Sequence, residues 1–406
     1  MVLRKTFPRD VRVEKEAKAL AAAGHDVTLV CKNDADQQQR ETVGPIDVHR
    51  FAEWTGSSLT RQRRSLSFLA TGHHDFWADA IRSVHRTSPI DAIHVHDLPL
   101  VETGLDVGDE FDVPVVADLH ENYPEAIRQW RRMHAREDVL TQPALLAKYL
   151  LRPVRRYKRI ERRAVRRADH VLAVCEEGRR HYLEDCGAEP ESVSVVGNTV
   201  DLDRDWFDAD AEPVSGYEDE FVVGYVGKYA PHRGLEAVVE GFAEVMERIP
   251  NARLLMVGAP GNDRYGERFD RHCERHGVVD ATTFTGWVDF EAVPNYMAAC
   301  DVCLVPHADT PHTNTTVPHK LFQYMALSKP VLVSDCPPLK RIVEDADAGL
   351  VAAAGDPDAM ADAMVELAED PALSRRLGEN GASAVRTTYN WRHDAETLVS
   401  VYESLP

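Results

Sequence analysis

Residues 221–245 decide the fold, and they read FVVGYVGKYAPHRGLEAVVEGFAEV. An apolar run of strand length ends at Gly227, a polar loop follows, and apolar residues then recur with helical spacing from Leu235 to Val245. A strand that runs directly into a helix is typical of a parallel sheet covered by helices. The loop carries two cations, Lys228 and Arg233, where the helix begins. Unpaired N–H groups at a helix start attract anions, so this stretch favours an α/β fold with a diphosphate-binding loop.

The same alternation of strand and helix extends along the rest of the chain. In the first half, only Met1 to Leu3 remain for a first strand, and further strands are predicted at 26–31, 46–51, 92–96, 113–118, 170–174 and 192–196. In the second half, strands are predicted at 221–226, 253–257, 282–284, 302–305, 330–334 and 349–352. Residues 198–220 are rich in Asp, Pro, Gly and Ser, which indicates a linker. The chain of 406 residues therefore favours two Rossmann-like domains.

A second helix start with an anion-binding character is predicted within residues 315–326, TTVPHKLFQYMA. Pro318 suits the first helical position and Thr316 precedes it as a cap, so Lys320 falls in the first turn. The helix dipole disfavours a cation there, and a bound anion would offset both the partial positive charge of the helix start and the charge of Lys320. Lys320, Gln323 and Tyr324 share one helix face, three and four residues apart. A solvated cation is the alternative for either loop taken alone, but two such loops in one half of the chain favour phosphate binding.

The order and spacing of these and further motifs resemble the retaining glycosyltransferases of family 4. The motifs that carry the resemblance are Phe7–Glu16, Ile93–Asp97, Asp118–Glu121, Gly227–Lys228 with Arg233–Glu236, Phe284–Val288, Asp301–Pro306, Pro318–Met325 and Tyr389–Trp391. The resemblance implies an α/β fold of the GT-B type, with two Rossmann-like domains that face a central cleft. It implies an N-terminal acceptor-binding domain at 1–200, a C-terminal nucleotide-sugar donor-binding domain at 201–390, and a last helix at 391–406 that crosses back to the N-terminal domain.

The resemblance also implies the functional residues. In the family, the positions that match Lys228 and Arg233 hold an Arg and a Lys that grip the donor diphosphate, so the two cations are exchanged here. His120 matches a histidine that contacts the donor sugar, and these three form the expected catalytic set. The expected donor-binding residues are Gly227, Lys228, Arg233, Gly258, Trp287, Val288, Thr315, Thr316, Lys320 and Gln323. The expected acceptor-side residues are His96, Asp97, Glu121 and Tyr123.

The chain departs from the family pattern at Thr315 and Gln323, where the family has two Glu residues with seven residues between them. Gln323 can still bind ribose hydroxyls, because its amide both donates and accepts hydrogen bonds. Thr315 offers only a hydroxyl to the donor sugar. Two alternatives to a transferase therefore stay open: a catalytically inactive nucleotide-sugar-binding protein, and a sugar-nucleotide epimerase of the same fold, which would need acid and base carboxylates near the sugar.

The activity implied by the resemblance is that of a hexosyltransferase. It would move a sugar, with retention of anomeric configuration, from a nucleotide-diphosphate sugar to a hydroxyl of a lipid-linked or saccharide acceptor. The expected co-substrate is a UDP-sugar, with no other cofactor and no metal. Such enzymes build polysaccharides, glycolipids and glycoproteins. In the family a phosphate oxygen of the leaving group takes the acceptor's proton, so no carboxylate pair of the glycosidase kind is needed.

Composition and charge limit the possible partners. The formal net charge of −20 argues against nucleic acid. The basic residues comprise 10 Lys and 37 Arg, which together with abundant Asp is typical of a halophilic archaeon, although a GC-rich genome also favours Arg over Lys. Seven cysteines and the absence of a secretory leader favour a cytoplasmic location. No apolar run approaches the ~20 residues that span a bilayer.

A basic stretch runs from Lys148 to Arg167 and contains only one acidic residue, Glu161. Apolar residues recur on the opposite face of the predicted helix. This pattern favours peripheral contact with anionic lipid on the inner face of the membrane, where a lipid-linked acceptor would be found. The alternative is an ordinary domain helix whose arginines pair with Asp and Glu elsewhere in the chain.

Overall fold

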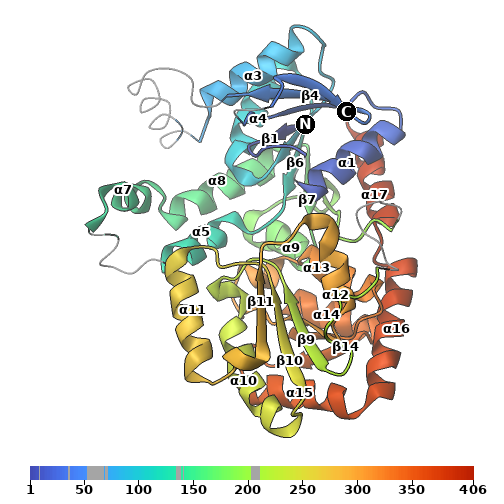
Figure 1. The fold of residues 1–406 in the computed structure, drawn as a ribbon. Helices are drawn as coiled ribbons and strands as arrows, with labels where there is room; N and C mark the ends of the chain where they lie inside the picture. Colours follow the sequence, from blue (N-terminus) through green and yellow to red (C-terminus); the bar gives the residue numbers. More distant parts are fainter. Residues whose placement is uncertain are drawn as a thin grey trace. The chain divides into compact units, whose positions relative to one another are not determined.

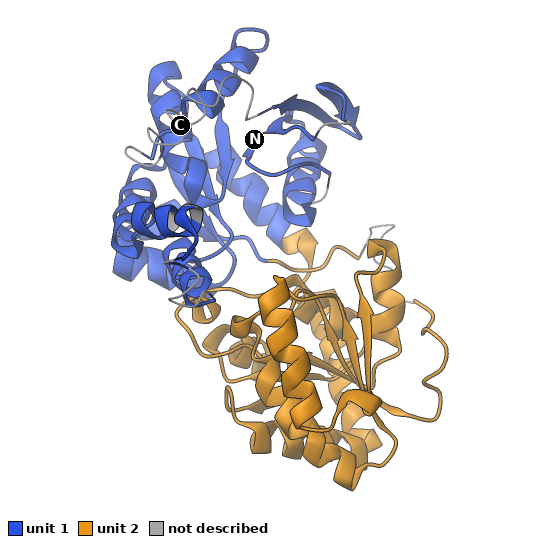
Figure 2. Ribbon diagram, turned by 60° about the vertical axis from the view of Figure 1, so that its left-hand side comes forward, with its two compact units in different colours: residues 1–197, 394–406 blue, residues 198–393 orange. Residues whose placement is uncertain are grey.

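The computed structural model describes residues 1–8, 10–34, 37–52, 68, 72–133, 139, 141–202 and 211–406. The chain forms two compact units (Figures 1 and 2). The first unit comprises Met1–Gly197 together with Asp394–Pro406, and the second comprises Asn198–His393. The end of the last helix therefore packs with the first unit. There the Tyr402 hydroxyl lies 2.8 Å from the Nδ1 of His94.

The first unit is built on an eight-stranded sheet with the order β3-β4-β2-β1-β5-β6-β7-β8. Its strands are β1 (Val2–Leu3), β2 (Thr28–Lys32), β3 (Arg40–Val43), β4 (Ile46–Phe51), β5 (Ile93–His96), β6 (Val115–Leu119), β7 (His170–Ala173) and β8 (Val193–Val195). Its helices are α1 (Val11–Ala22), α3 (Asp75–His85), α4 (Leu98–Phe111), α5 (Tyr123–Arg132), α7 (Pro143–Leu151), α8 (Val154–Arg167), α9 (Glu176–His181) and most of α17 (Trp391–Ser404). All strand pairs are parallel except β3 with β4. The strands β5, β6 and β7 are buried along their whole length, as expected for a sheet with helices on both faces.

The second unit is built on a six-stranded parallel sheet with the order β11-β10-β9-β12-β13-β14. Its strands are β9 (Phe221–Val226), β10 (Ala252–Val257), β11 (Thr282–Gly286), β12 (Val302–Val305), β13 (Val331–Ser334) and β14 (Gly349–Ala352). Its helices are α10 (Leu235–Arg248), α11 (Asp263–Arg275), α12 (Val293–Ala298), α13 (His319–Ala326), α14 (Pro337–Ala346), α15 (Pro357–Glu369) and α16 (Pro371–Thr387). The strand order reverses between β9 and β12, which are direct neighbours.

The structure confirms the predicted strands, with bounds that differ by at most two residues, and adds the edge strand β3. The four residues of β3 read RETV and three of them are exposed, so no apolar alternation marked this strand in the sequence. The predicted helix start at Pro318 is one residue early. Pro318 occupies the cap position, without a capping hydrogen bond from its side chain, and Thr316 is not the cap. Lys320 still falls in the first turn of α13.

All seven cysteines are buried and none forms a disulfide. Among the described residues, no helix is both long enough and apolar enough to cross a membrane.

Candidate functional site

The loops that follow β9 and β12 meet where the strand order of the second unit reverses. Ligands of open α/β sheets bind at this point, beyond the carboxyl ends of the strands. The loop after β9 carries Gly227, Lys228 and Arg233, and the segment after β12 leads to α13. The amide of Asn198 donates a hydrogen bond of 2.9 Å to the carbonyl of Val317 and so anchors the segment just before α13.

Lys320 reaches from the first turn of α13 to the end of β9. Its Nζ donates a 2.7 Å hydrogen bond to the carbonyl of Val226 and lies 3.6 Å from the centroid of the Tyr225 ring. One turn later, the Tyr324 hydroxyl accepts a hydrogen bond from the Val226 N–H at 2.9 Å. A Cβ at Gly227 would lie 3.3 Å from the Lys320 Nζ, so the absence of a side chain at Gly227 lets the cation approach the backbone.

The charges around Lys320 are positive or neutral. Burial and the Arg233 guanidinium lower the pKa of Lys320. Arg233 donates to the Nε2 of His307 at 2.8 Å. Burial, then the neighbouring cations, lower the pKa of His232 to about 3 and lower that of His307, so both rings are neutral at pH 7. Among the described residues, no carboxylate forms an ion pair with Lys228, Arg233 or Lys320. The loops therefore present uncompensated positive charge.

Two glycines hold these loops against one another. Gly234 has a φ of +67°, and a Cβ there would lie 1.9 Å from the carbonyl oxygen of Pro306. Gly258, after β10, has a φ of +123°, and a Cβ there would lie 2.3 Å from the carbonyl oxygen of Gly227. No larger residue fits either position without a shift of the backbone. The predicted residues Gly227, Gly258, Arg233 and Lys320 are thereby brought together.

The other predicted donor-site residues lie around this group. Trp287 and Val288 follow β11, and Trp287 is 68% exposed. The loop after β11 is joined to the loop after β10 by a hydrogen bond of 3.0 Å, which the Gly258 N–H donates to the Gly286 carbonyl. Thr315 donates its hydroxyl hydrogen within its own turn, to the carbonyl of Pro311 at 3.0 Å. Gln323 is partly exposed on α13, one turn after Lys320, and Thr316 precedes the helix.

A second charged cluster lies in the first unit, where α1 approaches the carboxyl ends of β5 and β6. Arg12 of α1 lies with its Nη2 2.6 Å from Asp118 and 3.0 Å from Glu16, and its Nη1 donates to the carbonyl of Val196 at 2.8 Å. His94 lies 3.3 Å from Glu16 through its Nε2. These groups are almost fully buried. The carboxylates of this cluster are thus paired with cations inside the unit.

His120 lies at the edge of this cluster. Its Nε2 is 2.6 Å from Asp118 and its Nδ1 is 3.4 Å from Asp97. Burial alone would lower the pKa of His120, but the two carboxylates raise it to about 9, so the ring is an imidazolium at pH 7. Both ring nitrogens face carboxylates, and a sugar hydroxyl would have to displace the longer contact with Asp97. His96 is 1% exposed and lies behind His120, 3.0 Å from Asp118, so it is not placed to touch an acceptor directly.

The remaining predicted acceptor-side residues lie near the start of α5. Glu121 is partly exposed, and Asn122 caps the helix by accepting from the N–H of Glu125 at 3.3 Å. The Tyr123 ring packs 5.6 Å from that of Tyr157 on α8, and burial raises the pKa of Tyr123 to about 12. The sequence analysis missed Arg12, Glu16 and His307 as members of the two charged clusters. Charged residues four apart on the apolar side of α1 were the available signal for Arg12 and Glu16.

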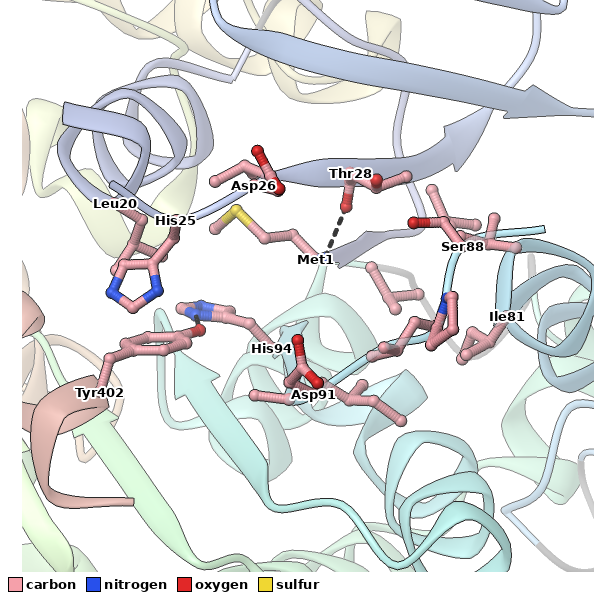
Figure 3. A pocket seen from close by; sticks show the side chains of 18 of the residues that line it. Met1, Leu20, His25, Asp26, Thr28, Ile81, Ser88, Asp91, His94 and Tyr402 are labelled. Carbon is pink, nitrogen blue, oxygen red and sulfur yellow. Dashed lines mark hydrogen bonds between the residues drawn. The ribbon is translucent and has the colours of Figure 1, made fainter. Parts of the chain in front are cut away.

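A cavity of about 380 Å³ lies at the opposite edge of the first sheet, near the amino ends of β2 and β5 (Figure 3). The Met1 amino group donates a 2.8 Å hydrogen bond to the carbonyl of Thr28 at its wall, and the His94 Nδ1 lies 2.8 Å from the Tyr402 hydroxyl. None of the predicted site residues lines this cavity. Of the described residues that line it, His94 is the one that also belongs to a charged cluster, so the cavity is distinct from both clusters.

Comparison with known proteins agrees with this architecture. Residues 11–204 match the family model described as Glycosyltransferase Family 4, and residues 220–370 match the model described as Glycosyl transferases group 1. Over 236 residues the chain is 28% identical to the phosphatidyl-myo-inositol mannosyltransferase of Mycobacterium leprae, which covers 58% of this chain and 59% of that protein. The chain thus matches about three fifths of the length of that relative.

Two solved structures share the fold. The sucrose-phosphate synthase of Thermosynechococcus elongatus superposes with a TM-score of 0.75 at 22% identity, over 99% of this chain and 94% of that one. The Anabaena protein HepE, solved in complex with UDP and glucose, superposes with a TM-score of 0.74 at 16% identity, over 100% and 99% of the two chains. Two Rossmann-like units of this topology define the GT-B class of proteins. Within that class, the chain belongs to the group 1 and family 4 glycosyltransferases.

Proposed function

We propose that this protein transfers a sugar from a nucleoside diphosphate sugar to a hydroxyl group, with retention at the anomeric carbon and without a metal. The observation that carries the proposal is the set of uncompensated cations Lys228, Arg233 and Lys320 at the switch point of the second sheet. A diphosphate would supply the negative charge that the protein itself does not supply there. UDP is the proposed nucleotide, which is also the nucleotide in the HepE complex.

The same cations would also accelerate the reaction. Negative charge grows on the departing diphosphate as the glycosidic bond breaks, so fixed cations stabilise the transition state more than the ground state. A phosphate oxygen would then take the proton from the acceptor hydroxyl. We assign Gln323 to the ribose hydroxyls, Trp287 and Val288 to the base, and His120, as an imidazolium, to the donor sugar. Thr315 and Thr316 would lie beside the sugar.

The alternatives are less well supported. An epimerase would need acid and base carboxylates near the sugar, and among the described residues no carboxylate pairs with the cations of the second unit's charged loops. An inactive binding protein would bind the nucleotide sugar without turnover. Incubation with a UDP-sugar and no acceptor identifies an epimerase, which would release a new UDP-sugar, and addition of an acceptor then separates a transferase from an inactive binding protein.

For the acceptor, we propose a lipid-linked or saccharide hydroxyl presented at the cytoplasmic face of the membrane. The arginines of α8 differ along the helix. Arg163 and Arg167 in its last turns form ion pairs with Glu102, and Arg167 also with Asp106 and Asp109. Arg155 and Arg159 have no ion-pair partner among the described residues. The side chain of Lys148 lies outside the described part.

This difference supports contact between the start of α8 and anionic lipid. We expect the protein to float with phosphatidylglycerol vesicles at low salt and to be released at high salt. Arg155→Glu and Arg159→Glu as single variants should each float less, whereas Arg163→Glu, which changes the net charge by the same amount at a paired position, is the matched control. Absence of flotation at any salt concentration would refute membrane contact and leave a soluble saccharide as the acceptor.

The donor proposal is tested with a panel of nucleotide sugars. We expect UDP-sugars to raise the melting temperature of the protein, and the best of them to be consumed when an acceptor is added. High salt suits the acidic composition. If GDP-sugars stabilise the protein and UDP-sugars do not, the nucleotide assignment is wrong. If no nucleotide diphosphate binds, the proposed function is wrong.

A further inference from the structure

Three side chains with metal-binding atoms converge inside the first unit, apart from the two charged clusters described above. They are Glu161 on α8, His181 at the end of α9, and Cys186 at the end of the short π-helical turn η1 (Tyr182–Cys186). Glu161 is 3% exposed and Cys186 is 1% exposed. None of the three is among the residues proposed to bind the nucleotide sugar or the acceptor.

The triangle of ligand atoms has the dimensions of a tetrahedral zinc site. The His181 Nε2 lies 3.3 Å from the Glu161 Oε2, and the Cys186 Sγ lies 3.8 Å from each of these two atoms. A tetrahedral zinc ion with bond lengths of about 2.3 Å to sulfur and about 2.0–2.2 Å to nitrogen and oxygen requires ligand-to-ligand distances of roughly 3.4–3.6 Å. The three atoms would therefore need to move only slightly to bind the ion.

The backbone and the surrounding side chains also suit a metal ligand set. Residues five apart are far apart around an α-helix, but the i→i+5 hydrogen bonding of a π-helical turn brings His181 and Cys186 to the same side. The other ring nitrogen of His181, Nδ1, lies 2.9 Å from the Asp185 carboxylate. A carboxylate in that position fixes the tautomer and the orientation of a metal-binding histidine.

We propose that Glu161, His181 and Cys186 bind one zinc ion, with water as the fourth ligand, and that the ion joins α8 to the α9–η1 segment. A thiolate, an imidazole and a carboxylate favour zinc over the hard cations magnesium and calcium, which bind through oxygen. Arg162 and Arg166 donate to the backbone carbonyls of Asp185 and Cys186 rather than to the ligand atoms. The Asn122 Nδ2 lies 3.5 Å from the His181 Nε2, a long contact that the ion would replace.

The other groups of potential ligands are less suitable. In the cluster of Glu16, His94, His96 and Asp118, the guanidinium of Arg12 already lies between the two carboxylates and would repel a metal ion. In the group of Glu240, His272 and His276, the residues are only partly buried and contain no thiol. These two groups therefore serve as internal controls.

Cobalt reports on the proposed site without relying on enzyme activity. After treatment with a chelator, we expect the 406-residue chain to bind about one Co²⁺, with visible bands of tetrahedral cobalt and a near-ultraviolet thiolate-to-cobalt band that zinc abolishes by displacement. Cys186→Ser should abolish the thiolate band. Asp185→Asn should weaken cobalt binding by about 10-fold to 100-fold, because it replaces the carboxylate that faces the His181 Nδ1 with a neutral amide.

Two matched variants complete the experiment. Cys31→Ser changes another buried, unpaired cysteine of the same unit, and His272→Ala changes a histidine of a rejected group; both should retain the thiolate band. Circular dichroism of each variant identifies any loss of fold, and Asp185→Asn leaves all three ligands in place if Cys186→Ser fails to fold. The proposal is overturned if the unmodified protein gives no thiolate band, if the band survives Cys186→Ser, or if Cys31→Ser abolishes it.

Discussion

The charged clusters at the carboxyl ends of the two sheets differ in how their charges are compensated. In the first unit, Arg12 lies between Asp118 and Glu16, and His120 is held by a further carboxylate. In the second unit, Arg233 and Lys320 contact neutral partners, a histidine ring and a backbone carbonyl. A compensated cluster stabilises the folded chain that builds it. An uncompensated cluster is stabilised only when an anion binds, so its residues should matter for binding more than for folding.

The largest effect on stability is expected for Arg12→Met. This change removes the guanidinium that pairs with both Asp118 and Glu16, and breaking a buried ion pair in this way costs about 3–5 kcal/mol of folding free energy. Denaturant unfolding measures the loss. Arg82→Met removes an exposed pair with Glu110 in the same unit and should cost less than about 1 kcal/mol. Equal losses for the two variants would show that the buried cluster does not stabilise the unit as argued.

Arg233→Ala should have the opposite effect, a large loss of activity with little loss of stability. We expect kcat/KM to fall by about 10²-fold to 10³-fold, because a fixed cation is removed from the departing diphosphate. The free energy of unfolding should change by less than about 1 kcal/mol, since within the described part of the chain the Arg233 side chain has one hydrogen-bond partner, His307. Steady-state kinetics with the UDP-sugar and denaturant unfolding measure the two effects, and isothermal titration with UDP measures the accompanying loss of affinity.

Arg268→Ala is the control for that variant, because Arg268 pairs with Glu236 on the surface of the same unit. Arg233→Lys keeps the charge and should retain part of the activity. If Arg233→Ala binds UDP with unchanged affinity, Arg233 lies outside the donor site. If it unfolds more readily by several kcal/mol, the contrast between the clusters fails.

The third prediction concerns pH, and it applies to the compensated cluster. The pKa of His120 is about 9 in the folded protein and about 6.5 in an unfolded chain. The resulting stabilisation is fully present below pH 6.5 and is lost as the pH rises through 9. We expect the unmodified protein to lose about 2 kcal/mol of stability between pH 7 and pH 10 relative to His120→Gln. Parallel stability curves for the two proteins would contradict the imidazolium assignment.

The sequence predicted the second unit better than the first. The run from Phe221 to Val245 and the first-turn position of Lys320 depend on local patterns, and both hold in the structure. The pairing of Arg12 with Asp118 joins residues 106 positions apart, which no periodicity reports. Likewise, the spacing of Glu161, His181 and Cys186 matches no short metal-binding motif; the residues meet because a π-helical turn changes their direction. Long-range charge compensation is the part that had to come from the structure.

The smallest predicted effect falls on Trp287, where the proposed donor contact involves no charge. Its indole is 68% exposed, so removal should change the free energy of unfolding by less than about 0.5 kcal/mol. Stacking of a base on an aromatic ring contributes about 1–3 kcal/mol, and at so exposed a position we expect the lower end, a loss of about fivefold in UDP affinity for Trp287→Ala. Trp287→Phe should retain most of the affinity. Salt then separates the two kinds of contact: higher salt should diminish the effect of Arg233→Ala on UDP binding and leave that of Trp287→Ala unchanged, because only the first is a screened charge interaction. An equal salt dependence would mean that Trp287 acts by holding the charged loops rather than by stacking on the base.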